Sequence, residues 1–138
     1  MELTRTNYSS GAPLEEKSGY SRMIKVGPFI YIGGTTAVLP DGTIHGEGSP
    51  YEQTKYVLEK QVNLLGKAGS KKEEVIKVKV YMTDMGYAPE VAKAYSEIFR
   101  EIKPLCTFVG TPMLNRPTQL VEIEMDAIIG AAVEGRGI

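Results

Sequence analysis

The chain has 138 residues, of which 42% are hydrophobic and 24% are charged, and its net charge is −1 at pH 7. This length and composition predict a single globular domain over residues 1–138 with a buried core. The near-neutral charge argues against a nucleic-acid partner, and no apolar run reaches the roughly 18 residues that a membrane helix needs. The single cysteine excludes an internal disulfide and predicts a reducing, cytoplasmic location.

The N-terminal third begins with a polar segment and continues into a hairpin. We predict an irregular lead-in over residues 1–19, with no apolar stretch of the kind that a signal peptide contains. Strands over residues 23–26 and 29–32, separated by a Gly-Pro turn, predict a hairpin. The adjacent glycines Gly33 and Gly34 indicate either a bulge or a group that approaches the backbone closely.

A first helix follows, and its two ends are marked in the sequence. Ser49, Pro50 and Glu52 form a capping-box pattern that predicts the helix start, and Gly69 predicts its end. One face between these ends is mostly apolar through about four turns. Residues 74–82 then alternate between apolar and polar side chains, which predicts a strand.

A second helix and two strands complete the pattern. Pro89 predicts the start of this helix, and Pro104 predicts its end. Residues 106–110 form a short strand, and residues 119–129 form a longer one. We expect residues 130–138 to be a flexible tail.

The last strand alternates strictly, so three carboxylates share one of its faces: Glu122, Glu124 and Asp126. Such a face is either exposed to solvent or contributes a carboxylate to a cleft. In a cleft, partial burial raises the pKa of a carboxylate toward values suited to acid–base chemistry.

The order of elements is β-β-α-β-α-β-β, which predicts an α+β fold. Right-handed crossovers place both helices on one face of a mixed sheet. The other face then carries polar and aromatic side chains: Lys77, Lys79, Tyr81, Glu122, Glu124 and Asp126. A face of this kind suits a subunit interface that encloses wet clefts, so we predict a homo-oligomer.

Several kinds of site are excluded by the sequence. It contains no phosphate-loop or dinucleotide-binding pattern, and no Cys and His cluster that binds zinc. The three acids of the last strand are roughly 6.5–7 Å apart along the chain, too far for all to share one ion. His45, the only histidine, lies in a turn-rich segment typical of a surface loop. No metal and no cofactor are predicted.

Short segments spread through the chain recur in one known family. They are Gly19-Tyr20-Ser21, Gly27, Ile30-Tyr31-Ile32-Gly33-Gly34, Gln53-Thr54, Asn63, Gly69, Val75-Ile76-Lys77, Asp84, Tyr95, Phe99, Pro104 and Val121-Glu122-Ile123-Glu124. Together they resemble the RidA/YjgF family of reactive intermediate deaminases, formerly described as L-PSP endoribonucleases or translation inhibitors, over nearly all of residues 8–129. The resemblance implies a chorismate-mutase-like fold, a homotrimer with a barrel-like core, and small-molecule clefts between neighbouring subunits.

The resemblance also implies roles for individual residues. The deaminases of this family hydrolyse imines and enamines, and an arginine in a Pro-Ala-Arg-Ser segment binds the substrate carboxylate. A glutamate on the last strand helps a water molecule attack the imine carbon, and it matches Glu124. The family's cleft tyrosine matches Tyr20, and backbone amides near Gly33 and Thr107 are expected to orient the ligand.

This chain departs from the family pattern at the arginine. Cys106 stands in its place, within Pro104-Leu105-Cys106-Thr107, and a thiol cannot replace a guanidinium as a carboxylate clamp. Gly33 stands where the deaminases usually have serine, and Ala92 where they have asparagine. Arg22 or Arg116 are candidates for a substitute cation. Cys106 itself is either a small apolar residue or a reactive cleft thiol.

Three functions remain open at this point. The first is a hydrolase or deaminase of C=N bonds, with Glu124 as general base and Tyr20, Gly33, Cys106 and Thr107 around the ligand. The second is a non-catalytic trimer that binds a metabolite or a protein. The third, a ribonuclease, is opposed by the near-neutral charge and by the lone loop histidine.

Overall fold

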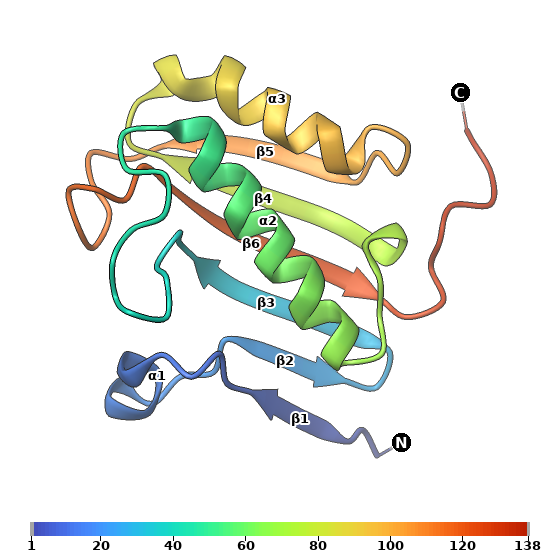
Figure 1. Cartoon of the computed structure of the whole chain (residues 1–138). Helices are drawn as coiled ribbons and strands as arrows, with labels where there is room; N and C mark the ends of the chain where they lie inside the picture. Colours follow the sequence, from blue (N-terminus) through green and yellow to red (C-terminus); the bar gives the residue numbers. More distant parts are fainter. Residues whose placement is uncertain (1, 138) are drawn as a thin grey trace.

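The computed structural model describes residues 2–137 and contains one six-stranded sheet with the strand order β1-β2-β3-β6-β4-β5 (Figure 1). The strands are β1 (Arg5–Tyr8), β2 (Met23–Val26), β3 (Phe29–Thr35), β4 (Val75–Met82), β5 (Leu105–Gly110) and β6 (Val121–Ile128). The helices are α1 (Pro13–Ser18), α2 (Pro50–Lys67) and α3 (Ala88–Phe99), with short 3-10 helices η1 (Lys72–Glu74) and η2 (Met85–Tyr87). Only β4 and β5 pair in parallel; all other neighbours are antiparallel.

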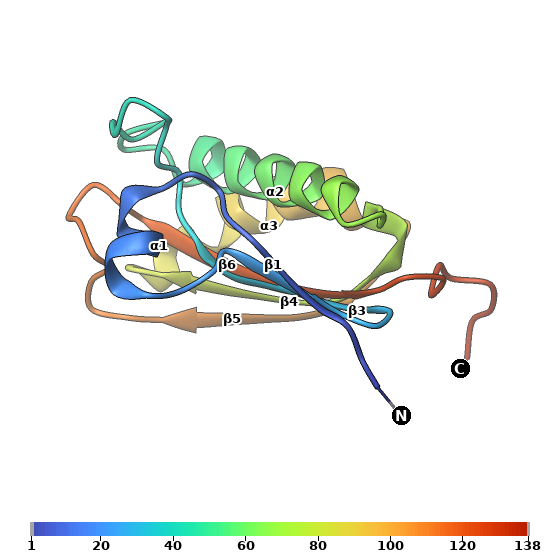
Figure 2. The same cartoon turned by 90° about the horizontal axis from the view of Figure 1, so that it is seen from below.

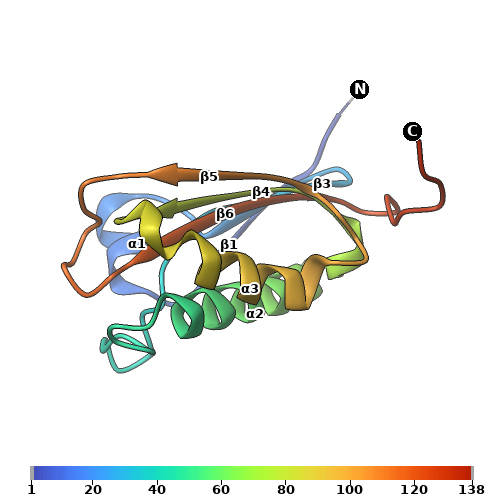
Figure 3. The ribbon, with the colours of Figure 1, turned by 90° about the horizontal axis from the view of Figure 1, so that it is seen from above.

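The two long helices lie on the same face of the sheet. Figures 2 and 3 show α2 and α3 side by side on that face, and neither covers the opposite face. The predicted α+β fold, a mixed sheet with two helices on one face, is confirmed. Within residues 2–137, no helix combines the length and the apolar character that a membrane crossing requires.

The predicted irregular lead-in over residues 1–19 is wrong. It contains β1, which pairs with β2, and the six-residue helix α1. The strand was missed because three of its four side chains are exposed, so its sequence has no apolar pattern. It is a strand because its backbone pairs with β2. The helix was missed because it is short, although Pro13 at its start and the left-handed Gly19 at its end are ordinary signals. Met1 and Ile138, the outer ends of the predicted lead-in and tail, lie outside the described residues.

Both ends of α2 are where the sequence predicts them. The Ser49 hydroxyl accepts a hydrogen bond of 3.1 Å from the Glu52 N–H. The reciprocal half of the predicted capping box is wrong, because the Ser49 N–H donates to the Gly46 carbonyl instead. At the other end Gly69 has a φ of +84°, and the Ser70 N–H donates to the carbonyl of Leu65, the third residue from the helix end (2.9 Å).

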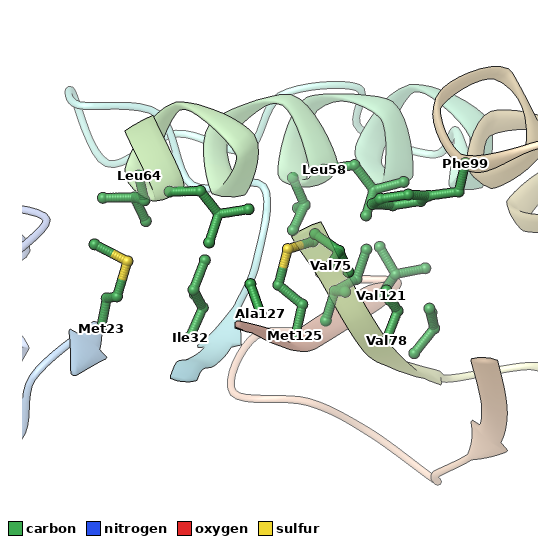
Figure 4. Close-up of a cluster of buried hydrophobic side chains, with 14 of the residues drawn as sticks. Met23, Ile32, Leu58, Leu64, Val75, Val78, Phe99, Val121, Met125 and Ala127 are labelled. Atoms are coloured by element: carbon green, nitrogen blue, oxygen red, sulfur yellow. The ribbon is translucent and has the colours of Figure 1, made fainter. Parts of the chain in front are cut away.

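The core lies between the helices and the apolar side of the central strands. Figure 4 shows Leu58 and Leu64 of α2 and Phe99 of α3 above the strand side chains, among them Met125 and Ala127 of β6. Each of these five side chains is at most 4% exposed. Burial of a large apolar side chain stabilises the fold by roughly 1.5–3 kcal/mol. Because the apolar residues of β6 alternate with acidic ones, the apolar face of β6 is the one that packs against the helices.

A bulge interrupts the pairing between β3 and β6. Ile32 pairs with Met125, but the next pair joins Thr35 to Ile123, so β3 spans one residue more than β6 there. The extra length falls at the two adjacent glycines. Beside the bulge, the buried side chain of Gln61 donates to the Ile123 carbonyl (2.8 Å), which ties α2 to β6 at this point.

The residues after β6 form no helix or strand up to residue 137. Their first turn is held by the buried carboxylate of Glu74, which accepts from the Gly130 N–H (2.6 Å) and from the Ser70 hydroxyl (2.7 Å). Farther on, Arg136 donates to the Glu101 carbonyl (2.8 Å). The flexibility expected of residues 130–138 stays a prediction.

Candidate functional site

The face of the sheet opposite α2 and α3, called the open face below, carries three cross-strand rows of side chains. Their registers are Leu105–Lys77–Asp126–Tyr31, Thr107–Lys79–Glu124 and Val109–Tyr81–Glu122. The second and third rows end at the bulge of β3. The predicted base Glu124 therefore lies in the middle of this face, two strands from the predicted ligand contact Thr107.

The other predicted site residues fall into two separate groups. Tyr20 and Gly33 lie at the β2–β3 side of the sheet, whereas Cys106 and Thr107 lie on the edge strand β5. Because β6 and β4 stand between β3 and β5, these strands are roughly 14 Å apart. Cys106 pairs with the buried Val78, so its side chain is on the helix side, opposite to Glu124. A single chain does not bring the five residues together.

Glu122 is the carboxylate of β6 that lies closest to the backbone of Gly34, at the bulge. A Cβ atom placed on Gly34 would lie 2.9 Å from its carboxyl carbon, so the missing side chain of that glycine makes room for it. Burial raises the pKa of Glu122, the charge of Glu124 raises it further, and the Arg22 guanidinium partly opposes the rise. Both interpretations of the glycine pair therefore hold, since a bulge and a close approach occur together.

Gly33 differs from its neighbour. The nearest atom to a Cβ atom placed there is the Arg22 carbonyl oxygen, at 3.6 Å, which is an ordinary contact. A Cβ atom therefore fits at Gly33 without displacing a neighbour, unlike at Gly34.

Arg22 contacts three neighbouring residues at this end of the sheet. Its Nε lies 3.4 Å from a carboxylate oxygen of Glu15 in α1, and its Nη1 donates to the Gly34 carbonyl. Its guanidinium carbon lies 5.5 Å from the centre of the Tyr20 ring, and the side chain is only 14% exposed. Arg116, the other candidate cation, lies on the loop after β5 and donates to the Gly42 carbonyl (2.5 Å).

The partner of Arg22, Glu15, is buried and ionised. Although burial alone raises its pKa, hydrogen bonds from Ser10 and Ser9 and the charge of Arg22 bring the pKa below its ordinary value. The Ser9 hydroxyl donates to it at 2.9 Å and the Ser10 N–H at 3.1 Å. Arg22 thus pairs with Glu15, and its charge also opposes the rise in the pKa of Glu122.

Cys106 is exposed at the sheet edge, with Tyr95 of α3 beside its thiol. Partial burial raises the pKa of Cys106, and the Tyr95 hydroxyl only partly offsets this. The pKa of Tyr95 is itself raised, first by burial. The thiol is therefore protonated at neutral pH, which argues against a reactive thiolate in the single chain.

Neither of two hollows in the surface contains a predicted site residue. One, of about 480 Å³, lies between the C-terminal segment and the end of α3; the other, of about 270 Å³, lies between α2 and Ser10. Among residues 2–137, no three His, Cys, Asp or Glu side chains are grouped closely enough to hold a metal ion.

The comparison with protein families gives one match, to the model described as endoribonuclease L-PSP, over residues 11–129. The chain belongs to this family. It is the RidA/YjgF family that the sequence resembles, so that prediction is confirmed. A RutC family protein of Pyrococcus abyssi is 38% identical over 109 residues, which cover 79% of this chain and 84% of the relative.

Solved structures of the endoribonuclease L-PSP family support the same fold. The crystal structure of a YjgF/YER057c/UK114 family member from Mycobacterium tuberculosis is 33% identical, with a TM-score of 0.83. The match covers 91% of this chain and all of the other. The chorismate-mutase-like fold is therefore confirmed. The mitochondrial protein mmf1 of Schizosaccharomyces pombe is 30% identical over 83% of this chain and 70% of its own length, and the cytoplasmic location stays a prediction.

Glu122 and Arg22 show what sequence reasoning could and could not find. Glu122 was grouped with the other acids of β6, because strict alternation treats the three alike. The sequence signal that separates it is the pair of glycines on β3, but only the strand register places those glycines beside it. Arg22 was a candidate cation, and the structure brings it to the bulge already paired with Glu15.

Proposed function

We propose that this chain forms a homotrimer that binds a small metabolite in clefts between subunits and hydrolyses a C=N bond there. The observation that carries the proposal is the separation of the site residues into two groups on opposite sides of one sheet. A neighbouring copy whose β5 lies beside the bulge of β3 would unite Cys106 and Thr107 of one subunit with Tyr20, Gly33 and Glu124 of the other.

Exposed apolar side chains support the contact between copies. On the open face, Tyr31 is 49% exposed and Leu105 is 67% exposed, and both Phe29 and Tyr20 are at least 40% exposed. Large apolar side chains gathered on one face mark an interaction surface. Burial of this face in a trimer also removes water from the carboxylates of β6.

The proposed reaction uses the residues of the bulge and of β6. Glu124 takes a proton from a water molecule as the water oxygen bonds to the carbon of the C=N group. The nitrogen receives that proton, which gives a carbinolamine. The hydroxyl proton of the carbinolamine then passes to the nitrogen as the C–N bond breaks, so that ammonia leaves and a carbonyl product forms. In this proposal Cys106 holds the position of the family's arginine, so a substrate carboxylate lacks its usual clamp.

The experiment compares imines generated in the assay by an amine oxidase or by an amino-acid oxidase. We expect the wild-type chain to accelerate hydrolysis of at least one imine, and Glu124→Gln to lower kcat by roughly 100-fold or more, as loss of a general base does. Light scattering on the same samples is expected to give the mass of a trimer. Unchanged turnover in Glu124→Gln would remove Glu124 from the mechanism, and a monomeric mass would remove the cleft.

The second candidate function is a trimer that binds its ligand without turning it over. The uncharged side chain of Cys106 favours it, because the substrate grip expected of the deaminases is missing. Saturable ligand binding without any imine turnover would identify this function. The ribonuclease that the family description suggests is disfavoured, because the near-neutral charge of the chain gives little attraction for a phosphate backbone.

A further inference from the structure

The position of Tyr20, a predicted ligand contact, depends on its neighbours and not on burial. Its side chain is 41% exposed, so packing alone does not fix the ring. At the end of α1, the N–H groups of Gly19 and Tyr20 both donate to the Glu15 carbonyl, at 2.9 and 3.0 Å. The ring centre lies 5.5 Å from the guanidinium carbon of Arg22. The backbone of Tyr20 is therefore held by Glu15, and its ring lies against Arg22.

The backbone of Arg22 is held by the sheet, but its side chain is not. Its N–H donates to the Tyr8 carbonyl (3.0 Å), and its carbonyl accepts from the Gly33 N–H (2.9 Å). Beyond this pairing the side chain has several rotatable bonds, so the direction of its guanidinium needs partners of its own. These are the Gly34 carbonyl and the Glu15 carboxylate, and only the carboxylate carries a charge.

The Glu15 carboxylate has a rigid environment. The residue is 3% exposed, and its side chain accepts hydrogen bonds from the Ser9 hydroxyl (2.9 Å), the Ser10 N–H (3.1 Å) and the Ser10 hydroxyl. The helix that carries it has six residues, far fewer than the roughly 12 that an isolated helix needs to be stable in water. The contacts of this buried carboxylate therefore anchor α1 and the residues on both sides of it.

Lys60 of α2 acts on the same pair from the helix side. Burial lowers the pKa of Lys60, the charge of Arg22 lowers it further, and the charge of Glu15 opposes this decrease. Two cations on different elements therefore lie within range of one buried carboxylate. Without the charge of Glu15, Arg22 and Lys60 would repel each other, and the guanidinium would turn away from its present position beside Tyr20.

We propose that Glu15 is a positioning residue of the inter-subunit cleft: its carboxylate holds the Arg22 guanidinium, which in turn holds the Tyr20 ring where the ligand binds. Glu15 is buried, so it acts through Arg22 and not on the ligand itself. This inference rests on the proposed function, because Tyr20 is one of the ligand contacts proposed there. It extends the site to α1, which contributes none of the predicted site residues.

The first test uses Glu15→Gln, which keeps the size and the backbone carbonyl of the residue and removes the charge. In the imine assay we expect KM to rise about tenfold with kcat changed less than about twofold, because the lost contact binds substrate and transition state alike. Glu16→Gln, at the exposed neighbouring position of α1, is the matched control and should keep the wild-type KM. An unchanged KM in Glu15→Gln would overturn the inference.

A double-variant comparison separates positioning from a general structural role. If Glu15 acts through Tyr20, the variant with both Glu15→Gln and Tyr20→Ala should have the same KM as Tyr20→Ala alone. Independent effects would instead multiply in the double variant. Multiplied effects would show that Glu15 does not act through the Tyr20 ring, and would overturn the inference.

A second measurement does not depend on turnover. NMR cross-relaxation between the ring protons of Tyr20 and the side-chain protons of Arg22 is expected in the wild type and in Glu16→Gln, and should be lost in Glu15→Gln. Circular dichroism checks that each variant is folded. Cross-relaxation that persisted in folded Glu15→Gln would overturn the inference.

Arg22→Lys provides a second route if Glu15→Gln does not fold. It keeps the charge beside Glu15 and removes the planar group beside Tyr20, so KM should rise as in Glu15→Gln. An unchanged KM in Arg22→Lys would break the proposed chain of contacts and overturn the inference.

Failure of the inference and failure of the proposed function give different results. A wild type without imine turnover, together with a Tyr20–Arg22 contact that is lost in Glu15→Gln, would reject catalysis and keep the positioning role. Imine turnover with the same KM in wild type and in Glu15→Gln would keep catalysis and reject the positioning role.

Discussion

Gly34 is the residue of the β3 bulge that lies against a carboxylate of the candidate site, that of Glu122. Its lack of a side chain lets the Glu122 carboxylate lie against β3, in the partly buried position that raises its pKa. We expect Gly34→Ala to displace this carboxylate and to bring the pKa of Glu122 back toward about 4.3, its ordinary value. The free energy of unfolding should fall by no more than about 1 kcal/mol, because the end of a glutamate side chain can rotate away.

Carboxylate titration by NMR measures this pKa, and urea unfolding measures the stability. Gly33→Ala is the matched control, because a Cβ atom there meets only an ordinary contact at 3.6 Å. The interpretation of Gly34 would be incorrect if both variants left the Glu122 titration unchanged.

At this scale the sequence predicted the chemistry of the site better than its geometry. The alternation of β6 correctly put the three carboxylates on one face. Alternation could not distinguish Glu122 from Glu124. The surroundings of Glu122 depend on a bulge in β3 and on Arg22, which precedes β2. Pairing of Arg22 with Glu15 was equally hidden, since α1 was not predicted.

At the scale of elements, Glu74 holds the start of the C-terminal segment to the loop after α2. Hydrogen bonds from Ser70 and from Gly130 lower its pKa. A carboxylate with a lowered folded-state pKa contributes stability above its unfolded pKa of about 4.3, and this contribution is lost as pH falls through the folded-state value. Glu74→Gln should therefore lower the free energy of unfolding by about 1–3 kcal/mol at pH 7, and much less at pH 2–3.

Urea unfolding of the wild type and of Glu74→Gln at several pH values measures this difference. Glu73→Gln, at the neighbouring and less buried position, serves as control. A difference between wild type and Glu74→Gln that stayed constant from pH 7 to pH 3 would show that the ionised form of Glu74 makes no special contribution.

Helices and strands with a periodic apolar pattern or a helix-capping residue could be predicted from the sequence. A strand that forms only because it pairs with a neighbouring strand could not. The ends of α2 follow from Ser49 and Gly69, and the faces of β4 and β6 follow from alternation. By contrast, β1 contains four mostly exposed residues, and it is a strand because the edge of β2 is available. Edge pairing of this kind depends on tertiary context, which a local pattern does not contain.

At the scale of the whole molecule, Leu105 tests whether copies associate through β5. It is 67% exposed on the edge strand, which is unusual for a side chain of this kind. Leu105→Asp should therefore convert the proposed trimer to monomers while leaving the secondary structure of each chain intact, because this side chain lies outside the core. Light scattering gives the mass, and circular dichroism checks the fold.

Leu14→Asp is the comparison variant, since this leucine is also exposed, at 47%, but lies on α1. If the proposed trimer forms through β5, Leu14→Asp should leave its mass unchanged. A trimer that persisted in Leu105→Asp would exclude this part of β5 from the contact.

The position of β6 has a consequence for how the chain is made. It is the last of the six strands in sequence, yet it lies in the centre of the sheet, between β3 and β4. During synthesis the strands β1–β3 and the pair β4–β5 are therefore not joined to each other until β6 has left the ribosome, and the β3–β6 contacts that close the sheet span most of the chain. The strand that carries Glu122 and Glu124 is thus also the strand that joins the two parts of the sheet, so the acidic site and the continuous sheet form together.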